Sequence, residues 1–272
     1  MADAAGIDWE DAFLNSVYIP DGASYPGRWQ ARAAEFRANA KAQLDIPYGP
    51  HERERFDLFM PEGRPKGLAV IIHGGFWLAF DKSVWSDLAT GALAQGWAVA
   101  FPGYTLAPEA RIGAIARQVG RAIVAAAGLV AGPIRLCGHS AGGQVATRLV
   151  CGDTPLPGEV ASRIAHVVTL SGLHDLRPLQ FHSMNKGLRL DAEEAAAESP
   201  ALLDPLPGVP VTAWVGAAER PEFLRQSALL AEAWGRKGQQ IQLIAEAGRN
   251  HFDVLDGLKD PDHPLMRAFL GG

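Results

Sequence analysis

The chain has 272 residues, of which 48% are hydrophobic and 20% are charged, an ordinary balance for a globular protein with a sizeable core. A formal net charge of −5 and scattered Lys and Arg residues argue against nucleic acid or an anionic membrane as a partner. The two cysteines, Cys137 and Cys151, cannot form a disulfide framework, and we interpret them as packed thiols in a reducing compartment.

The N-terminal sequence is acidic and lacks a long apolar run, which argues against a secretory signal. We find no stretch with the roughly 18 apolar residues that a membrane span needs. These features predict a cytoplasmic protein with no membrane partner, and the length suits one domain over residues 1–272.

In chain order, residues 1–50 are predicted to form an N-terminal arm, with helical composition over residues 27–44. Residues 53–60 alternate like a half-buried antiparallel strand, and the apolar run 67–75 predicts a buried central strand. Strands and helices then alternate. Expected helices cover 82–96, 110–128, the segment after Ser140, 221–238 and the C-terminal tail. Expected strands cover 97–104, 133–138, 163–172, 208–217 and 239–248. The alternation predicts an α/β fold with a mostly parallel central sheet flanked by helices.

Residues 174–206 break this alternation, because they contain several prolines and no strand pattern. We interpret them as a small cap-like insertion within the single domain.

Gly138-His139-Ser140-Ala141-Gly142 follows a predicted strand and precedes a predicted helix. In that context the pattern G-x-S-x-G predicts a nucleophile elbow, a strained turn that exposes the serine hydroxyl. The alternative is an ordinary glycine-rich turn. The assignment therefore depends on finding an oxyanion hole, a base and an acid elsewhere in the chain.

A loop after the central strand, His73-Gly74-Gly75-Phe76-Trp77, is typical of an oxyanion hole in this topology. The predicted donors are the amide of Ala141 and backbone amides from the stretch Gly74, Gly75 and Phe76. The alternative, a simple strand-ending turn, is hard to combine with a G-x-S-x-G pattern at this interval.

The chain order Ser, acid, His selects His251 as the general base, since it follows the last predicted strand and precedes a helix. Other histidines lie before or inside the elbow, in a predicted strand, in the insertion or in an exposed turn: His73, His139, His166, His174, His182 and His263.

Glu219 is the first carboxylate after the strand at residues 208–217, and we predict it to be the acid of the triad. Glu222 is the alternative, although Pro221 suits a first helical turn and places Glu222 on the helix, where the dipole favours a carboxylate. Asp253 and Asp256 are too close to His251 in the chain.

These residues together predict a serine hydrolase in which Ser140 attacks a carbonyl and His251 moves the proton. Glu219 would hold the histidine tautomer. The mechanism requires a small-molecule substrate and no metal or organic cofactor, and the sequence contains none of the common metal or phosphate motifs.

With these residues in view, the chain resembles the α/β-hydrolase superfamily, and within it the kynurenine formamidase (arylformamidase) branch and related bacterial carboxylesterases. The resemblance runs from about residue 10 to the end. It rests on HGGFW (73–77), GHSAG (138–142), SGLHDLRPL (171–179), LRLDAEEAAAESP (188–200) and ERPEFLRQS (219–227). YTLAPE (104–109) is similar to a motif of hormone-sensitive-lipase-like esterases. The branch often has aspartate where this chain has Glu219. Homodimers are common among such proteins, although nothing in this sequence marks an interface.

The resemblance implies hydrolysis of N-formyl-L-kynurenine to kynurenine and formate. The leaving group is then a flat aromatic amine, and we expect a slot whose walls include aromatic and apolar side chains and the elbow histidine: Trp77, Trp85, Tyr104, Phe181, Met184 and His139. The alternative for the aromatic residues is that they simply fill the core.

Two other functions remain compatible with the sequence. A carboxylesterase for short-chain acyl esters would use the same site, because function depends on the pocket and not on the fold. An inactive hydrolase-like binding protein fits less well, since Ser140, Glu219 and His251 are all present.

Overall fold

The computed structural model describes residues 6–271, and within them the chain forms one eight-stranded sheet with strand order β1-β2-β4-β3-β5-β6-β7-β8. The β1–β2 and β2–β4 pairs are antiparallel, and all other neighbouring strands are parallel. The strands are β1 (Ala42–Pro47), β2 (Arg55–Phe59), β3 (Leu68–Ile72), β4 (Ala98–Pro102), β5 (Ile134–His139), β6 (Ile164–Leu170), β7 (Val211–Gly216) and β8 (Ile241–Glu246). The predicted mostly parallel sheet is confirmed.

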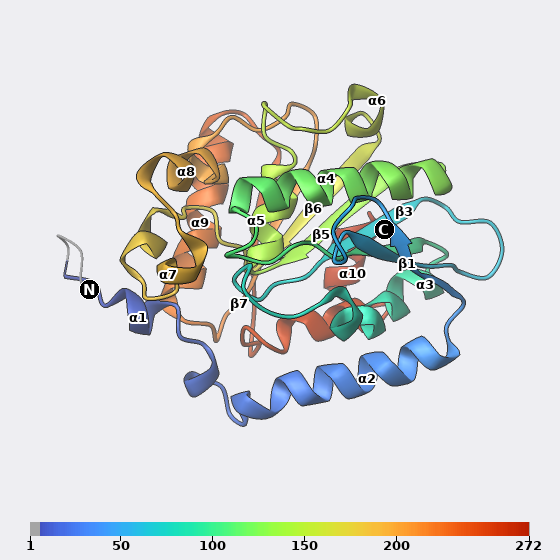
Figure 1. The fold of residues 1–272 in the computed structure, drawn as a ribbon, viewed down its shortest axis with the longest axis horizontal. Coiled ribbons are helices and arrows are strands. Elements are labelled where there is room, and N and C mark those ends of the chain that lie inside the picture. Colours follow the sequence, from blue (N-terminus) through green and yellow to red (C-terminus); the bar gives the residue numbers. More distant parts are fainter. Residues whose placement is uncertain (1–5, 272) are drawn as a thin grey trace.

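Helices cover both faces of this sheet (Figure 1). Strand β3 shows why its sequence is a continuous apolar run: Leu68, Val70 and Ile72 belong to one buried cluster, while Ala69 and Ile71 belong to another. The helices of the first face are α4 (Ile112–Leu129), α5 (Ala141–Arg148) and α9 (Pro221–Arg236). Those of the second face are α2 (Tyr25–Asn39), η3 (Lys82–Ala89), α3 (Thr90–Ala94), η6 (Val254–Lys259) and α10 (Pro264–Leu270).

Helix α4 is long and apolar enough to cross a membrane by length and composition alone, although Arg117, Gln118 and Arg121 interrupt its apolar residues. In the structure 56% of the helix is buried inside the protein, and Ile115, Val119 and Ile123 lie in the core. The core helix of a globular domain passes the same test, so the finding is weak evidence for a membrane span.

The N-terminal segment contains more than a helical arm. It forms α1 (Trp9–Ala12), η1 (Ser16–Tyr18), η2 (Gly22–Ser24), α2 and the edge strand β1, while residues 1–5 and residue 272 lie outside the described residues. The helix predicted over 27–44 ends at Asn39, because Ala42 begins a strand that pairs with β2. Helix α2 is anchored by Arg37, whose Nη1 lies 2.5 Å from Oδ2 of the fully buried Asp57 in β2.

Residues 174–206 form four short helical segments, η4 (Arg177–Phe181), α7 (Asn185–Leu188), α8 (Ala192–Ala197) and η5 (Pro200–Leu202). Leu179, Leu188 and Leu190 of this insertion are buried in the core of the first face. The insertion is therefore packed onto the domain. The turn helix α6 (Gly158–Ala161) precedes β6.

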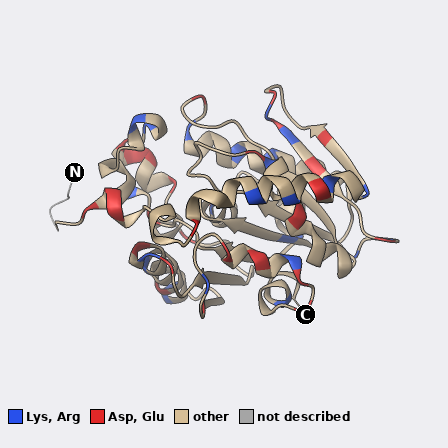
Figure 2. Ribbon diagram, turned by 90° about the horizontal axis from the view of Figure 1, so that it is seen from below, with Lys and Arg blue, Asp and Glu red and all other residues tan. Residues whose placement is uncertain are grey.

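Charged residues of both signs are interspersed along the helices (Figure 2). Many of them form ion pairs, such as Arg148 with Asp153 at 2.8 Å and Arg225 with Glu222 at 2.7 Å.

Candidate active site

Ser140 lies on a sharp turn between β5 and α5, at the carboxyl end of the central strands. Its backbone has φ 55° and ψ −118°, a region that residues other than glycine rarely adopt. The Ser140 amide donates a hydrogen bond to the carbonyl of Leu170 at the end of β6, at 2.9 Å. The turn is thus held in a strained conformation by the neighbouring strand.

The glycines of the motif are required by close backbone approach. A Cβ added to Gly138 would lie 2.0 Å from the carbonyl oxygen of Gly142, and a Cβ on Gly142 would lie 2.1 Å from that of Ile72. Because both contacts are with backbone atoms, no side-chain rearrangement could relieve them. The pattern G-x-S-x-G therefore follows from the geometry of this turn.

Glu219 and His251 are brought together by the loops after β7 and β8. Nδ1 of His251 donates to Oε2 of Glu219 at 2.6 Å, and both side chains are buried. Oε1 of Glu219 accepts two further hydrogen bonds, from the Gly216 amide at 2.8 Å and from the Ser171 hydroxyl at 2.5 Å. Three donors therefore fix this carboxylate in place.

Ser171 is a site residue that sequence reasoning missed. It follows β6 directly, with φ 53°, and is fully buried. Its position directly after a strand could have indicated this role. The carboxyl ends of parallel strands meet at one edge of the sheet, and sites form at that edge.

Glu222, the alternative acid, is engaged elsewhere. Its carboxylate accepts hydrogen bonds from Arg225 and Gln226 on α9, each at 2.7 Å. In the described part of the chain it makes no contact with His251 that would compete with Glu219.

His139 packs against His251, with ring centroids 4.6 Å apart, and its Nε2 donates to the backbone carbonyl of His251 at 3.0 Å. Burial, and secondarily the neighbouring His251, hold the pKa of His139 well below its ordinary value. His139 is therefore neutral near pH 7 and positions the His251 backbone.

The loop after β3 has three consecutive residues with left-handed backbone: Gly75 at φ 113°, Phe76 at φ 51° and Trp77 at φ 58°. It lies against the elbow, because a Cβ on Gly74 would come within 3.0 Å of Cβ of Ser140. The Ala141 amide starts α5, so it has no acceptor within the helix. The Gly74 backbone and the Ala141 amide therefore lie next to Ser140, and the oxyanion hole built from this loop stays a prediction.

One cavity of about 310 Å³, here called the aromatic cavity, adjoins this turn. Its wall includes His139 and Ser140 from the turn after β5, and His251 from the loop after β8. Gly75 and Phe76 from the loop after β3 also line it, together with apolar and polar residues from other segments. The latter are Phe13, Leu14, Asn15, Ser16, Gly22, Ala23, Pro26, Trp29, Phe80, Trp85, His182, Met184 and Phe252.

The N-terminal segment supplies much of this wall, which sequence reasoning did not foresee. Phe13 contacts Phe76 edge to face at 6.5 Å, and the Trp29 ring lies 4.7 Å from that of Trp85. No local pattern could reveal these contacts, since they join segments more than 50 residues apart.

Three of the residues expected in the slot do not line the aromatic cavity. Trp77 is fully buried, and its indole donates to Gln144 at 3.2 Å, which ties the strained loop to α5. Tyr104 is also fully buried and stacks on His73, whose carbonyl accepts its hydroxyl at 2.9 Å. Phe181 is 42% exposed. Trp85, Met184 and His139 do line it.

Most of the other histidines have structural contacts. His174 sits between the hydroxyls of Thr147 and Thr169, at 3.3 and 3.1 Å, and burial lowers its pKa to about 3. His263 caps α10 with a side chain only 19% exposed, so the expectation that it is exposed is wrong.

Among residues 6–271, no group of three or more His, Cys, Asp or Glu side chains is arranged to hold a metal ion.

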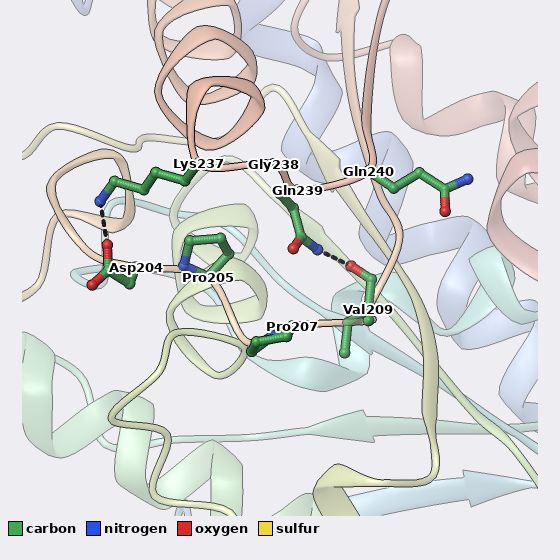
Figure 3. Close-up of a pocket in the computed structure, with 9 residues that line it drawn as sticks. Asp204, Pro205, Pro207, Val209, Lys237, Gly238, Gln239 and Gln240 are labelled. Carbon is green, nitrogen blue, oxygen red and sulfur yellow. Dashed lines mark hydrogen bonds and ion pairs between the residues drawn. The ribbon is translucent and has the colours of Figure 1, made fainter.

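Figure 3 shows a separate cavity of about 300 Å³, whose wall lies at the amino ends of β7 and β8. Its wall precedes β7 and β8, whereas Ser140 follows the end of β5. Lys237 and Asp204 form an ion pair across it at 2.7 Å, and Gln239 donates to the Val209 carbonyl. Its wall residues include no serine, cysteine or histidine, whereas Ser140 and His251 both line the aromatic cavity.

A strained serine and a carboxylate–imidazole pair at the carboxyl edge of a mostly parallel sheet define a hydrolase of the α/β class. The chain belongs to the Alpha/beta hydrolase family, whose sequence model matches residues 69–270. The fold class and the enzyme class predicted from sequence are both confirmed.

Kynurenine formamidases are among its relatives. That of Danio rerio is 28% identical over 86% of this chain and 83% of its own length. That of Drosophila melanogaster is 24% identical over 79% of this chain and 76% of its own length. These relatives confirm the resemblance to kynurenine formamidases that the sequence motifs indicated.

Solved structures share the fold. A crystal structure from Silicibacter sp. TM1040, provisionally described as a thioesterase, is 46% identical with a TM-score of 0.93, covering 97% of this chain and all of that one. Esterase B of Lactobacillus rhamnosis, 17% identical, has a TM-score of 0.68 and covers 91% of both chains, which shows the fold alone.

Proposed function

We propose that this protein hydrolyses an aryl formamide, such as N-formyl-L-kynurenine to kynurenine and formate, with Ser140, His251 and Glu219 as its catalytic triad. The observation that carries the proposal is the 2.6 Å hydrogen bond between Glu219 and His251 beside a cavity that Ser140 also lines. The names of the 24–28% identical relatives support the substrate class.

In this mechanism Ser140 attacks the formyl carbon while His251 accepts the serine proton. The tetrahedral oxyanion is stabilised by the amides of Ala141 and of the Gly74–Phe76 stretch, each worth roughly 3 kcal/mol in the transition state. His251 then gives the proton to the departing aryl amine, and water hydrolyses the formyl ester on Ser140. Glu219 holds the imidazole tautomer and stabilises the imidazolium.

The cavity suits such a substrate. Its volume of about 310 Å³ is near the lower end of the range for small-molecule sites, about 300–1,000 Å³. Trp29, Phe80 and Trp85 offer flat apolar surfaces for an aromatic ring, while the formyl group is the smallest acyl group.

A second candidate is hydrolysis of short-chain esters or thioesters. The 46% identical relative is provisionally described as a thioesterase, and it is more similar to this chain than the formamidases are. The same triad would act on either leaving group.

The deciding measurement is kcat/KM for N-formyl-L-kynurenine beside p-nitrophenyl esters from acetate to octanoate and an acetyl thioester, on one purified sample. A formamide value of about 10⁴ M⁻¹s⁻¹ or above is expected. Negligible formamide turnover with rapid ester or thioester hydrolysis would replace the proposal with the second candidate. Absence of all turnover, together with no labelling of Ser140 by a fluorophosphonate, would favour an inactive binding protein.

A further inference from the structure

Asn15 lies where two cavities meet. The aromatic cavity and a neighbouring cavity of about 250 Å³ share Asn15 and His251 in their walls. The neighbouring cavity, here called the polar cavity, is lined by Asn15, Tyr18, Ile19, Ala218, Glu219, Arg220, Pro221 and His251. The two cavities therefore adjoin each other beside His251.

The side-chain amide of Asn15 is not sealed inside the protein, although the residue as a whole is largely buried. The residue is 6% exposed, and within residues 6–271 its amide group makes no hydrogen bond, not even as the cap of η1. Its backbone is fixed, because its carbonyl accepts the Tyr18 amide at 3.0 Å. Because this amide makes no hydrogen bond to the described residues and is not sealed from the adjoining cavities, it can donate to or accept from a ligand there.

Charge is distributed unequally between the two cavities. The residues that line the aromatic cavity include no Lys, Arg, Asp or Glu, whereas Glu219 and Arg220 both line the polar cavity. The Glu219 carboxylate is already engaged by three donors. The Arg220 guanidinium lies 3.8 Å above the Tyr18 ring, and its Nη2 donates to Asp11. Its Nε is buried and makes no hydrogen bond within the described residues. Nη1 also makes no hydrogen bond within the described residues and, unlike Nε, is not one of the fully buried atoms, so Nη1 is the donor left for a ligand.

We propose that Asn15 and Arg220 form a subsite for a carboxylate-bearing end of the leaving group, while its flat ring occupies the aromatic cavity. The substrate class is then an aromatic formamide or ester whose ring carries a short chain ending in a carboxylate. The inference rests on the proposed function. For N-formyl-L-kynurenine, this end is the α-amino acid, which is joined to the ring through a ketone.

The test compares substrates that differ only in this end. N-formyl-L-kynurenine is paired with 2-formamidoacetophenone, which keeps the ring and ketone but has no amino acid. A parallel ester pair is 4-(2-acetoxyphenyl)-4-oxobutanoate with 2-acetoxyacetophenone. The quantity measured is the ratio of kcat/KM for the carboxylate-bearing member to that for the truncated member.

Asn15→Ala and Arg220→Gln are each expected to lower this ratio about tenfold or more, mainly through KM, as for the loss of a hydrogen bond to a charged group. Asn15→Asp should lower it further, since two carboxylates would repel. Asn39→Ala, at the exposed end of α2, is the matched control and should leave the ratio unchanged. Asp11→Asn weakens the ion pair but keeps the guanidinium, so it should also preserve the ratio.

If a variant lowered kcat/KM equally for both members of a substrate pair, the subsite would be overturned. Such a loss would mean that the substitution only disturbs the cavity wall and does not remove a contact with the carboxylate. An unchanged ratio in Asn15→Ala and Arg220→Gln would overturn it as well. Failure of the proposed function gives a different result: the wild-type protein would hydrolyse the esters but not the formamides, and the ester pair would still decide the subsite.

Discussion

The hydroxyl of Ser171 donates to Oε1 of Glu219 at 2.5 Å, while Oε2 of the same carboxylate accepts from His251. Ser171 follows β6, Glu219 follows β7 and His251 follows β8, so three adjacent strand ends contribute to one hydrogen-bonded chain. Together with the Gly216 amide, which donates to Oε1 at 2.8 Å, the hydroxyl holds the carboxylate in the orientation that faces the imidazole. Ser171 lines neither the aromatic nor the polar cavity, so in the proposed mechanism its role is to position the acid.

Replacing Ser171 by Ala should lower kcat about tenfold and change KM little, because a hydrogen bond to a charged group contributes about 1.5–3 kcal/mol. Steady-state kinetics with the best substrate provides the measurement. Ser162→Ala, at the exposed end of α6, is the matched control and should behave like the wild type. A loss confined to KM would instead place Ser171 in substrate binding.

The elements that could be predicted from sequence are those with local patterns. The run from Leu68 to Ile72 is apolar because both faces of β3 are buried, and the elbow glycines are required by backbone contacts within a few residues of Ser140 or on β3. Strand β1 was missed because its pairing with β2, and not its own composition, makes it a strand.

The wall of the aromatic cavity could not be predicted for the same reason. Phe13 and Trp29 reach the site only through the packing of the N-terminal segment, and no periodicity encodes that packing. Trp77 and Tyr104 lie close to site residues in sequence, yet their rings point into the core, where they support the strained loop. Proximity along the chain indicates the neighbourhood of a site but not the direction of a side chain.

Ser140→Ala should reduce turnover by about 10³-fold or more, since the mechanism loses its nucleophile. The far-UV circular dichroism spectrum and the thermal midpoint should stay close to those of the wild type, because alanine can occupy the same backbone conformation. A variant that keeps substantial turnover would show that a different group attacks the substrate.

Glu219→Gln should lower kcat by about 10³-fold, as the amide cannot stabilise an imidazolium and presents the wrong donor to Nδ1. Glu222→Gln is the matched control with the same chemical change three residues away. It should keep kcat within about threefold and affect only stability, by about 1–3 kcal/mol, since it breaks a pair with Arg225. The reverse ranking of kcat would assign the acid to Glu222.

Gly142→Ala should destabilise the protein by at least ~3 kcal/mol, because the new methyl group would collide with the backbone of β3 at the Ile72 carbonyl. Urea denaturation provides the measurement. Gly128→Ala makes the same change on α4, where no atom lies within 4 Å, and should instead stabilise by ~0.5 kcal/mol. Equal effects at the two positions would contradict the close approach.

His174 should make stability depend on pH. Burial lowers its pKa in the folded protein to about 3, against about 6.5 in an unfolded chain, so protons bind preferentially to the unfolded state. The stabilising contribution is thus fully present above about pH 6.5 and is lost as the pH falls from 6.5 towards 3.

His174→Gln removes this titration and keeps a group that can hydrogen-bond Thr147 and Thr169. The free energy of unfolding of the wild type, relative to that of the variant, should fall by about 2 kcal/mol between pH 6.5 and pH 5. Urea denaturation at intervals of half a pH unit measures this difference, and the subtraction removes the contributions of His73, His139 and His166. If the stability curves of the wild type and the variant stayed parallel down to pH 5, His174 would have to be protonated in the folded protein. Its complete burial and its position between two hydroxyls make that protonation costly.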